Sequence, residues 1–427
     1  MITVMIVAFF VFAILGLPLA FALGLAAVSG MLFAGFDLAQ LPGKMLHSVD
    51  SFPLMAIPLF MLAGQLMIRG GIMEPLIDVA NAVVGRVRGG LAHVTIVAAM
   101  GVSSVSGVAV ADATALGGSI GPHLAKAYSK TFAAALVAAA SCMGPIIPPS
   151  AAMIVYAVVA SDVSVAGLFM AGIVPGIVIG VAMMILCGII AKRRGYPISG
   201  EPFSFRRVLV TARKAFLIFL MPIIVIGGII GGVFTATEGA AVAVFYGLVV
   251  GFLVTRKLKF ADLAPALLNA GIITAVVGAL IAFSSVVTYL FTLNRVGDLL
   301  ASGLLSISRD PTVFIVLMMA VLLVLGMFME GNAIIIMLAP IAAPIAATLQ
   351  IDPVYFGFLF VLNVVLGSIT PPVGILLFVV SSIWRVGMVE LVREIFPFIV
   401  LLYGILALCV IFPDIAIGLP RLLGYAS

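Results

Sequence analysis

Long apolar stretches, separated by short polar segments, make up most of the chain. Runs such as 1–36 and 217–255 approach or exceed the ~20 residues that a helix needs to cross the hydrocarbon core of a bilayer. The pattern therefore predicts an all-α, polytopic membrane protein that is surrounded by lipid.

Within this pattern the apolar runs predict two similar sets of elements, one in each half of the chain. The first half, 1–192, is expected to hold spans, an amphipathic arm that carries Glu74, Asp78, Arg86 and Arg88, a re-entrant helical hairpin and a broken helix. Its elements are 1–16, 18–36, 52–68, the hairpin 91–125, the broken helix 131–160, and 165–191. The second half, 215–427, is expected to hold 215–233, 237–255, 263–293, an interfacial segment at 294–309, the hairpin 312–347, the broken helix 354–384, and 396–413. The basic segment 193–214 is expected to link the halves as a cytoplasmic loop.

Two Pro-Pro pairs interrupt the apolar runs, in GPIIPPS at 144–150 and in GSITPPVG at 367–374. Adjacent prolines donate no backbone hydrogen bonds and fix φ, so each pair should break its helix. The two motifs are 223 residues apart, and Asp112 and Pro122 are separated by 218 residues from Glu330 and Pro340. Matching landmarks at a nearly constant spacing predict an internal repeat.

Basic residues predict how the repeats are oriented. With the spans placed as above, all but four of the 21 Lys and Arg residues fall on one side of the membrane. The four on the opposite side are Lys44, Arg295, Arg309 and Arg421. Because cytoplasmic loops are rich in Lys and Arg, this distribution predicts an external location for both termini and opposite topologies for the two repeats.

Composition narrows the possible function. Only 9% of the residues are charged, against about 25% in a soluble domain, and the net charge of +5 is spread over short loops. No nucleic-acid partner is therefore expected. The sequence contains no HExxH, GxSxG or GxxxxGKS motif, so neither an enzyme nor a self-contained ATP-driven pump is expected. The three cysteines show no metal-ligand spacing.

Each proline break predicts exposed backbone oxygen near the middle of the membrane. Irregular backbone is tolerated there only inside protein or beside a cavity, and freed carbonyls can coordinate a cation. Hydroxyl and glycine residues surround both breaks, and the hairpin tips SSVSG at 103–107 and GMFMEGN at 326–332 add similar groups. Two related Na⁺ sites, each built from a hairpin tip and a break, are expected. The alternative is that the prolines only shape helix packing.

Ionisable and polar residues beside the hairpin tips are further candidates. An ionisable side chain inside a membrane is by default a functional hypothesis. Asp112 and Glu330 are expected either to support a cation site electrostatically or to hydrogen-bond a hairpin backbone, and the sequence favours neither role. The full set of candidates for substrate contact or hairpin support is Ser104, Asp112, Met329, Glu330 and Asn332.

An ordered set of motifs resembles a known family. GPIIPPS followed by AAMIVYA, GVFTATEGAAVAVFYGL, GMFMEGNAIIIMLAPI and DPVYFGFLFVLNVVLGSITPPVGILLFV are similar to the large membrane subunit of tripartite ATP-independent periplasmic (TRAP) transporters. The resemblance implies an elevator-type ion-transporter fold in a bacterial inner membrane. It also implies a small four-helix membrane subunit and a periplasmic substrate-binding protein as partners, with Na⁺-driven uptake of a carboxylate-bearing solute such as a C4-dicarboxylate, sialic acid or a sugar acid.

The same resemblance implies specific site residues. The first sodium site would use Ser103, Ser106, Gly144, Ile147 and Ser150. The second would use Gly326, Gly367, Thr370 and Val373. Glu330 stands where the family motif has Asp, and no Lys or Arg lies in the expected transport core. No cofactor beyond the coupling Na⁺ is implied.

Charged residues at the entrance to the second hairpin suggest where the binding protein docks. Arg295, Asp298, Arg309 and Asp310 lie on the external face in this topology. Ordinary solvated interface residues are the alternative interpretation. A stand-alone Na⁺-coupled dicarboxylate symporter, and a channel or structural membrane protein, remain the alternatives to the tripartite function.

Overall fold

The structure, a computed structural model, describes residues 1–160, 163–196, 198, 203–295 and 310–426. These residues form 20 α-helices, a 3₁₀ helix and a π-helix, with one isolated bridge between Arg88 and Ile198. Seven helical stretches in this part of the chain are long and apolar enough to cross a membrane. The expected all-α class of a polytopic membrane protein is therefore confirmed. The first two expected spans, 1–16 and 18–36, form the shorter apolar helices Ile2–Ile14 and Leu19–Ala34, which are not among these seven stretches.

The first half of the chain ends with a long helix after its Pro-Pro pair. Its elements are α1 (Ile2–Ile14), α2 (Leu19–Ala34), α3 (Gln40–Val49), η1 (Phe52–Met55), α4 (Ala56–Arg69), α5 (Met73–Val84), α6 (Gly90–Ser106), α7 (Ala109–Ser119), α8 (Gly121–Ala127), α9 (Lys130–Ser141), α10 (Ala151–Val159) and α11 (Val165–Arg193). The chain leaves the helical conformation between α9 and α10, where Pro148 and Pro149 lie.

In the second half, a Pro-Pro pair again separates two helices. Its elements are α12 (Phe205–Ile230), α13 (Ala236–Val249), η2 (Val250–Val254), α14 (Phe260–Leu293), α16 (Pro311–Gly326), α17 (Gly331–Thr348), α18 (Pro353–Gly367), α19 (Ile375–Trp384), α20 (Met388–Ile411) and α21 (Asp414–Leu422). Pro371 and Pro372 lie between α18 and α19.

The linker expected at 193–214 is shorter than its composition suggested. Its last ten residues, FRRVLVTARK, form the start of α12. Arg, Leu and Lys are good helix formers, and the run contains neither Pro nor Gly, so polarity alone did not mark a loop. Likewise α20 begins at Met388, eight residues before the expected span, because the polar segment MVELVREI continues the helix outward. The short helices α3 and α21 were not expected.

Local signals in the sequence explain several helix starts. Thr235 accepts a hydrogen bond from the backbone N–H of Glu238 at 3.2 Å, and the Glu238 carboxylate accepts one from the Thr235 N–H at 2.8 Å. This reciprocal capping box satisfies two N–H groups that would otherwise lack partners at the start of α13. Ser129 and Ser164 cap α9 and α11 in a simpler way, each through its side-chain oxygen.

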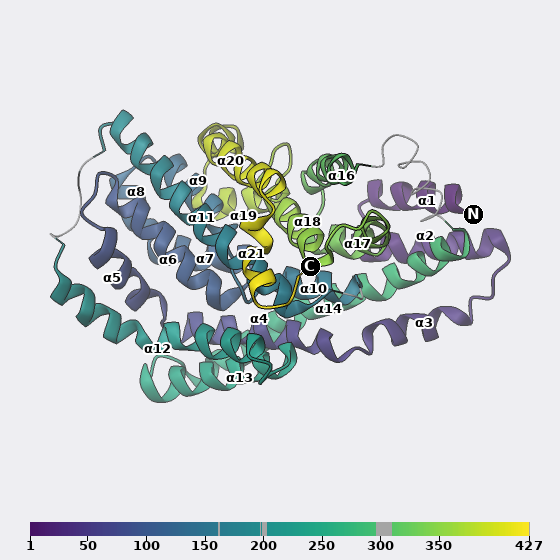
Figure 1. Cartoon of the computed structure of the whole chain (residues 1–427), viewed down its shortest axis with the longest axis horizontal. Coiled ribbons are helices and arrows are strands. Elements are labelled where there is room, and N and C mark those ends of the chain that lie inside the picture. Colours follow the sequence, from purple (N-terminus) through teal and green to yellow (C-terminus); the bar gives the residue numbers. More distant parts are fainter. Residues whose placement is uncertain (161–162, 197, 199–202, 296–309, 427) are drawn as a thin grey trace.

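Helices from the two halves are interleaved in space (Figure 1). α4 packs along α13 and α14, and α2 packs along α14. Gly247 of α13 lies at this contact, and even a Cβ there would be in ordinary van der Waals contact with α4, 3.4 Å from the Leu66 side chain. An ion pair between Arg69 and Asp262, at 3.7 Å, joins the end of α4 to the start of α14. The halves therefore form one body.

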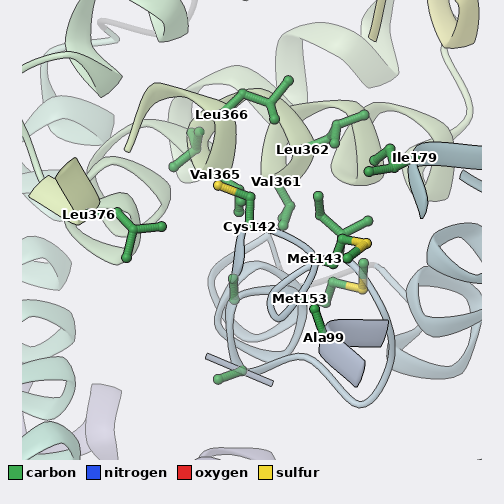
Figure 2. Close-up of a cluster of buried hydrophobic side chains, with 14 of the residues drawn as sticks. Ala99, Cys142, Met143, Met153, Ile179, Val361, Leu362, Val365, Leu366 and Leu376 are labelled. Carbon is green, nitrogen blue, oxygen red and sulfur yellow. The ribbon is translucent and has the colours of Figure 1, made fainter. Parts of the chain in front are cut away.

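The most densely buried region lies where the first break meets α18. Figure 2 shows Cys142 and Met143, which follow α9, among side chains of α18 that include Val361, Leu362 and Val365. Cys142 and Met143 are fully buried, as are most residues of α9. The non-helical backbone at this break is thus enclosed by protein, which a membrane protein requires of irregular backbone at such a depth.

Candidate functional site

The tip of the first hairpin is organised by a buried carboxylate. α6 ends at Ser106, Gly107 adopts a left-handed conformation with φ of 66°, and α7 begins at Ala109. Asp112, in the first turn of α7, accepts a hydrogen bond from Ser103 Oγ at 2.8 Å and another from Ser106 Oγ. Asp112 is fully buried. The carboxylate therefore ties the two helices together through side-chain hydroxyls.

The first Pro-Pro break packs directly against this tip. A Cβ on Gly144 would lie 2.7 Å from Asp112 Oδ2 and 3.0 Å from the Val108 carbonyl carbon. A Cβ on Gly107 would lie 2.5 Å from the Pro149 carbonyl oxygen. Ser150, the N-cap of α10, donates to the Pro145 carbonyl at 2.6 Å and accepts from the Met153 N–H at 3.2 Å. Both glycines are needed for this backbone-to-backbone contact.

The second hairpin meets the second break in a similar way. Gly326, at the end of α16, lies against Gly367, at the end of α18, and a Cβ on Gly367 would lie 2.6 Å from the Gly326 Cα. The Gly374 N–H of the break donates to the Met327 carbonyl of the tip at 3.1 Å. Thr370 Oγ1 donates to the Leu366 carbonyl at 2.7 Å and lies 3.2 Å from the Tyr403 hydroxyl.

Glu330 has a different role from Asp112. It is the N-cap of α17, where its Oε2 accepts from the Ala333 N–H and its Oε1 accepts from Asn332 Nδ2, both at 3.0 Å. The sequence left two roles open for Glu330. The contact with the Ala333 N–H corresponds to the second of them, hydrogen bonding to a hairpin backbone.

A cavity of about 110 Å³ lies between the two hairpin tips and the two breaks. It is bordered by the N-terminal ends of four helices: Ala109 of α7, Ala151 of α10, Gly331 of α17 and Ile375 of α19. α10 packs against α17, and α19 packs against α7, so each break supports the hairpin of the other half. The first backbone N–H groups of a helix have no acceptor within that helix, and the dipole adds about half a positive charge there. This arrangement suits an anion.

All five residues expected at the first sodium site lie at the first hairpin tip or in the first break, but the side chain of one of them, Ile147, points to another helix. Ser103, Ser106 and Gly144 surround Asp112, and Ser150 lies at the far end of the break. The fifth residue, Ile147, lies within the same break, and its side chain packs against Gly176 of α11.

At the expected second sodium site, two residues are in direct contact and the others lie along the break. Gly326 and Gly367 touch, Thr370 lies in the first turn after α18, and Val373 precedes Gly374 in the non-helical segment. Hydroxyl and carbonyl oxygens dominate both locations. Among the described residues, no cluster of three or more His, Cys, Asp or Glu side chains offers an alternative metal site.

Of the five candidates for substrate contact, two line the cavity of about 110 Å³ and three do not. Glu330 and Asn332 line the cavity of about 110 Å³. Ser104 instead donates to the Gly101 carbonyl of its own helix, and Asp112 lies beneath the first tip. Met329 lines a different, apolar cavity between hairpin 2 (α16–α17) and the helices α1, α2 and α14.

The expected docking residues are only partly within the described chain. Asp298 and Arg309, together with most of the interfacial segment expected at 294–309, lie outside the described residues. Arg295 follows α14 in an exposed position, and Asp310 is the N-cap of α16, where it accepts from the Thr312 N–H at 2.7 Å. Asp310 thus stabilises the N-terminus of α16, the first helix of hairpin 2.

Several cavity residues were not expected from the sequence, because they are small or apolar. They are Val108, Ala109, Val110, Ala151, Ala152, Ile375 and Leu376. All of them except Val108 lie in the first turn of a helix, where backbone N–H groups have no acceptor within that helix. Val108 and Leu376 already donate their N–H groups, to Ser106 Oγ at 3.3 Å and to the Ser368 carbonyl at 3.0 Å.

A usable signal was present at three of the four helix starts around the cavity. The helices α10, α19 and α17 begin directly after Ser150, Gly374 and Glu330, which are common residue types at helix N-termini, whereas α7 begins after Val108.

Comparisons with known proteins identify the family of the chain. Residues 6–415 match the family described as "Tripartite ATP-independent periplasmic transporter, DctM component". The chain is 37% identical to the sialic acid TRAP transporter large permease protein SiaM of Vibrio cholerae, over 96% of this chain and 97% of that protein. It is 36% identical to the C4-dicarboxylate TRAP transporter large permease protein DctM of Pseudomonas aeruginosa, over 94% of each.

A solved structure supports the fold. The YdaH transporter of Alcanivorax borkumensis superimposes with a TM-score of 0.63 and 15% identity, covering 89% of this chain and 88% of that chain. At this identity the likeness shows the fold alone. The family match, in contrast, spans almost the whole chain and includes both breaks and both hairpins. The chain is therefore a multi-pass protein of the inner membrane and belongs to the family of large permease (DctM) subunits of TRAP transporters.

Proposed function

We propose that this chain is the transmembrane subunit of a Na⁺-coupled uptake system for a small carboxylate-bearing organic anion. The observation that carries the proposal is the cavity on which four helix N-termini converge, since converging N–H groups and helix dipoles attract an anion without any Lys or Arg. Sialic acid and C4-dicarboxylates, which appear in the names of the relatives, carry the carboxylate that such a site would bind.

The same geometry gives a physical reason for coupling to sodium. Glu330 lines the cavity, and Asp112 lies beneath the first hairpin tip. Two carboxylates near an anion raise the free energy of its binding unless cations are bound nearby. Na⁺ held between each hairpin tip and its break, by the hydroxyl and carbonyl oxygens there, would offset this repulsion. Solute and ion would then bind together and cross together.

We further propose an elevator-type movement with inverted repeats, in which the hairpins and breaks move relative to helices such as α4, α13 and α14. The family description is tripartite, so a small membrane subunit and a periplasmic binding protein are proposed as the other components. The exposed Arg295, which follows α14, is proposed as a contact for the binding protein.

Reconstitution tests the whole proposal. Proteoliposomes that contain this chain with its membrane partner and binding protein should accumulate radiolabelled sialic acid or succinate under an inward Na⁺ gradient, and should not do so under a K⁺ gradient. Comparable Na⁺-driven uptake by this chain alone would favour a stand-alone symporter instead. Downhill flux that needs neither ion would indicate a channel.

A further prediction tests whether Thr370 is a ligand at the second sodium site. Thr370→Ala should raise the Na⁺ concentration for half-maximal uptake about tenfold, as expected when loss of a ligand oxygen costs ~1.4 kcal/mol. Thr348→Ala is the matched control, because Thr348 is exposed, its Oγ1 donates to the Pro344 carbonyl of its own helix, and it does not line the cavity of about 110 Å³. Equal Na⁺ titrations for the two variants, at equal protein levels, would place the site elsewhere.

A further inference from the structure

A buried hydrogen bond joins hairpin 2 to the long helix α14. Ser284 Oγ of α14 donates to the Ile336 carbonyl of α17 at 2.9 Å, and only 3% of the Ser284 surface is exposed. The two residues are 52 positions apart in the chain, so the bond is a tertiary contact and not part of either helix.

The sequence explains why this carbonyl needs a partner from outside its helix. In an α-helix, the carbonyl of residue 336 would accept from the N–H of residue 340, but position 340 is proline and has no N–H. A carbonyl without a donor in an apolar environment is costly. Ser284 supplies the missing donor.

The packing around this bond is loose. Ser284 borders two cavities, an apolar one of about 300 Å³ that also touches Met329, Met337 and Phe9, and a second of about 260 Å³ that also touches Pro340 and Thr288. Because side chains do not fill the space next to the bond, close packing does little there to fix the position of α17 relative to α14. The hydrogen bond then contributes a larger share of that positioning.

Ile336 is directly connected to the cavity that is proposed to bind the anion. Glu330, Gly331 and Asn332, in the N-cap and first turn of α17, line that cavity, and so does Ile335, which precedes Ile336. A shift of α17 along or away from α14 must therefore move part of the cavity wall.

We propose that Ser284 is a positioning residue that holds hairpin 2 against α14 in the state seen here, by satisfying the carbonyl that Pro340 leaves without a donor. The bond must break when hairpin 2 moves away from α14, so its strength sets how often the hairpin opens. This inference deepens the proposed transport function and rests on it for its role in the cycle, but the contact itself can be tested without transport.

Thiol labelling measures hairpin opening directly. The reporter is Ile335→Cys, which lies in the cavity wall, in a background where the three buried native cysteines are replaced by alanine. The full chain is reconstituted in proteoliposomes, and its labelling rate with a small water-soluble thiol reagent is measured in sodium chloride. Ser284→Ala should raise the rate about tenfold, which corresponds to the loss of ~1.4 kcal/mol from one buried hydrogen bond.

Three further variants separate this role from a general loss of structure. Ser285→Ala removes a neighbouring hydroxyl that bonds the Ala282 carbonyl of its own helix, so it should leave the rate unchanged. Ser284→Thr keeps the hydroxyl and has cavity space for the extra methyl group, so it should restore the slow rate. Pro340→Ala in the Ser284→Ala background returns an N–H to the Ile336 carbonyl within α17, and should bring labelling to within about twofold of the starting rate.

The labelling rates of these variants decide whether Ser284 holds hairpin 2 against α14. Slow labelling of Ser284→Ala, or equally fast labelling of Ser284→Ala and Ser284→Thr, would overturn the assignment. If the Pro340→Ala double variant does not fold, the Thr variant still decides. Because labelling needs neither solute nor partner protein, a failure of Na⁺-driven uptake would reject the proposed function without changing this outcome, and the reverse also holds.

Discussion

Replacing Gly367 with alanine should abolish Na⁺-driven uptake while leaving the protein inserted in the membrane. The new Cβ would lie 2.6 Å from the Gly326 Cα and 2.8 Å from the Gly326 carbonyl carbon, so backbone has to move and no side-chain rotation can relieve the clash. The tip of hairpin 2 would be pushed away from the second break. Since a displacement of ~1 Å in a binding site can cost ~100-fold in rate, we expect an initial uptake rate at least about 100-fold lower.

The chain offers matched variants for this measurement. Gly326→Ala should have the same effect from the other side of the contact, with its Cβ 2.9 Å from the Gly367 Cα. Gly404→Ala, in α20, is the control, because no atom lies within 4 Å of a Cβ there. Uptake is measured in proteoliposomes at equal amounts of monodisperse protein. Normal uptake by Gly367→Ala would show that transport does not depend on this contact.

Asp112→Asn should have the second-largest effect on uptake. We expect it to weaken Na⁺ binding and not only to destabilise the fold. The carboxyl group accepts from Ser103 and Ser106, two of the expected sodium ligands, and lies beside Gly144, a third. An amide can take no negative charge and accepts these hydrogen bonds more weakly, so the half-saturating Na⁺ concentration should rise more than about tenfold, which corresponds to ~1.4 kcal/mol. The measurement is a Na⁺ titration of the uptake rate.

Thr114→Val is the matched control for Asp112. Thr114 lies on the same helix, is exposed, and bonds only its own helix through the Val110 carbonyl among the hydrogen bonds of the described chain. It should leave the titration unchanged. A normal Na⁺ dependence in Asp112→Asn, together with normal uptake, would remove Asp112 from the first sodium site and leave it a purely structural role.

The two Pro-Pro pairs predicted where two helices are interrupted, because the effect of proline on a helix is local. The pairs Pro148–Pro149 and Pro371–Pro372 cannot continue a helix, and both lie in non-helical segments. The ends of α12 and α20 were harder to predict, since polar segments such as FRRVLVTARK are compatible with either a loop or an extended helix. Only the tertiary environment distinguishes the two.

The candidate site was predictable in kind but not in detail. Hydroxyl-rich tips and breaks indicated where oxygen ligands gather, yet nothing local in the sequence pairs Gly326 with Gly367 or places Ala151 beside Gly331. Such pairs depend on how α10 packs against α17 and how α19 packs against α7. The residues concerned offer backbone groups, and every residue except proline has the same N–H, so side-chain chemistry gave no sign of them.

The packing of α4 along α13 also has a consequence for synthesis. α4 ends at Arg69 and α13 begins at Ala236. At ~5–20 residues per second, a ribosome completes α13 roughly ten to thirty seconds after α4. During that interval the face of α4 that includes Leu66 and Met67, buried in the finished protein and next to Gly247 of α13, has no α13 to cover it. The first half must therefore wait in the membrane as an incomplete intermediate, and the protein reaches its final packing only after more than half of the chain has been inserted.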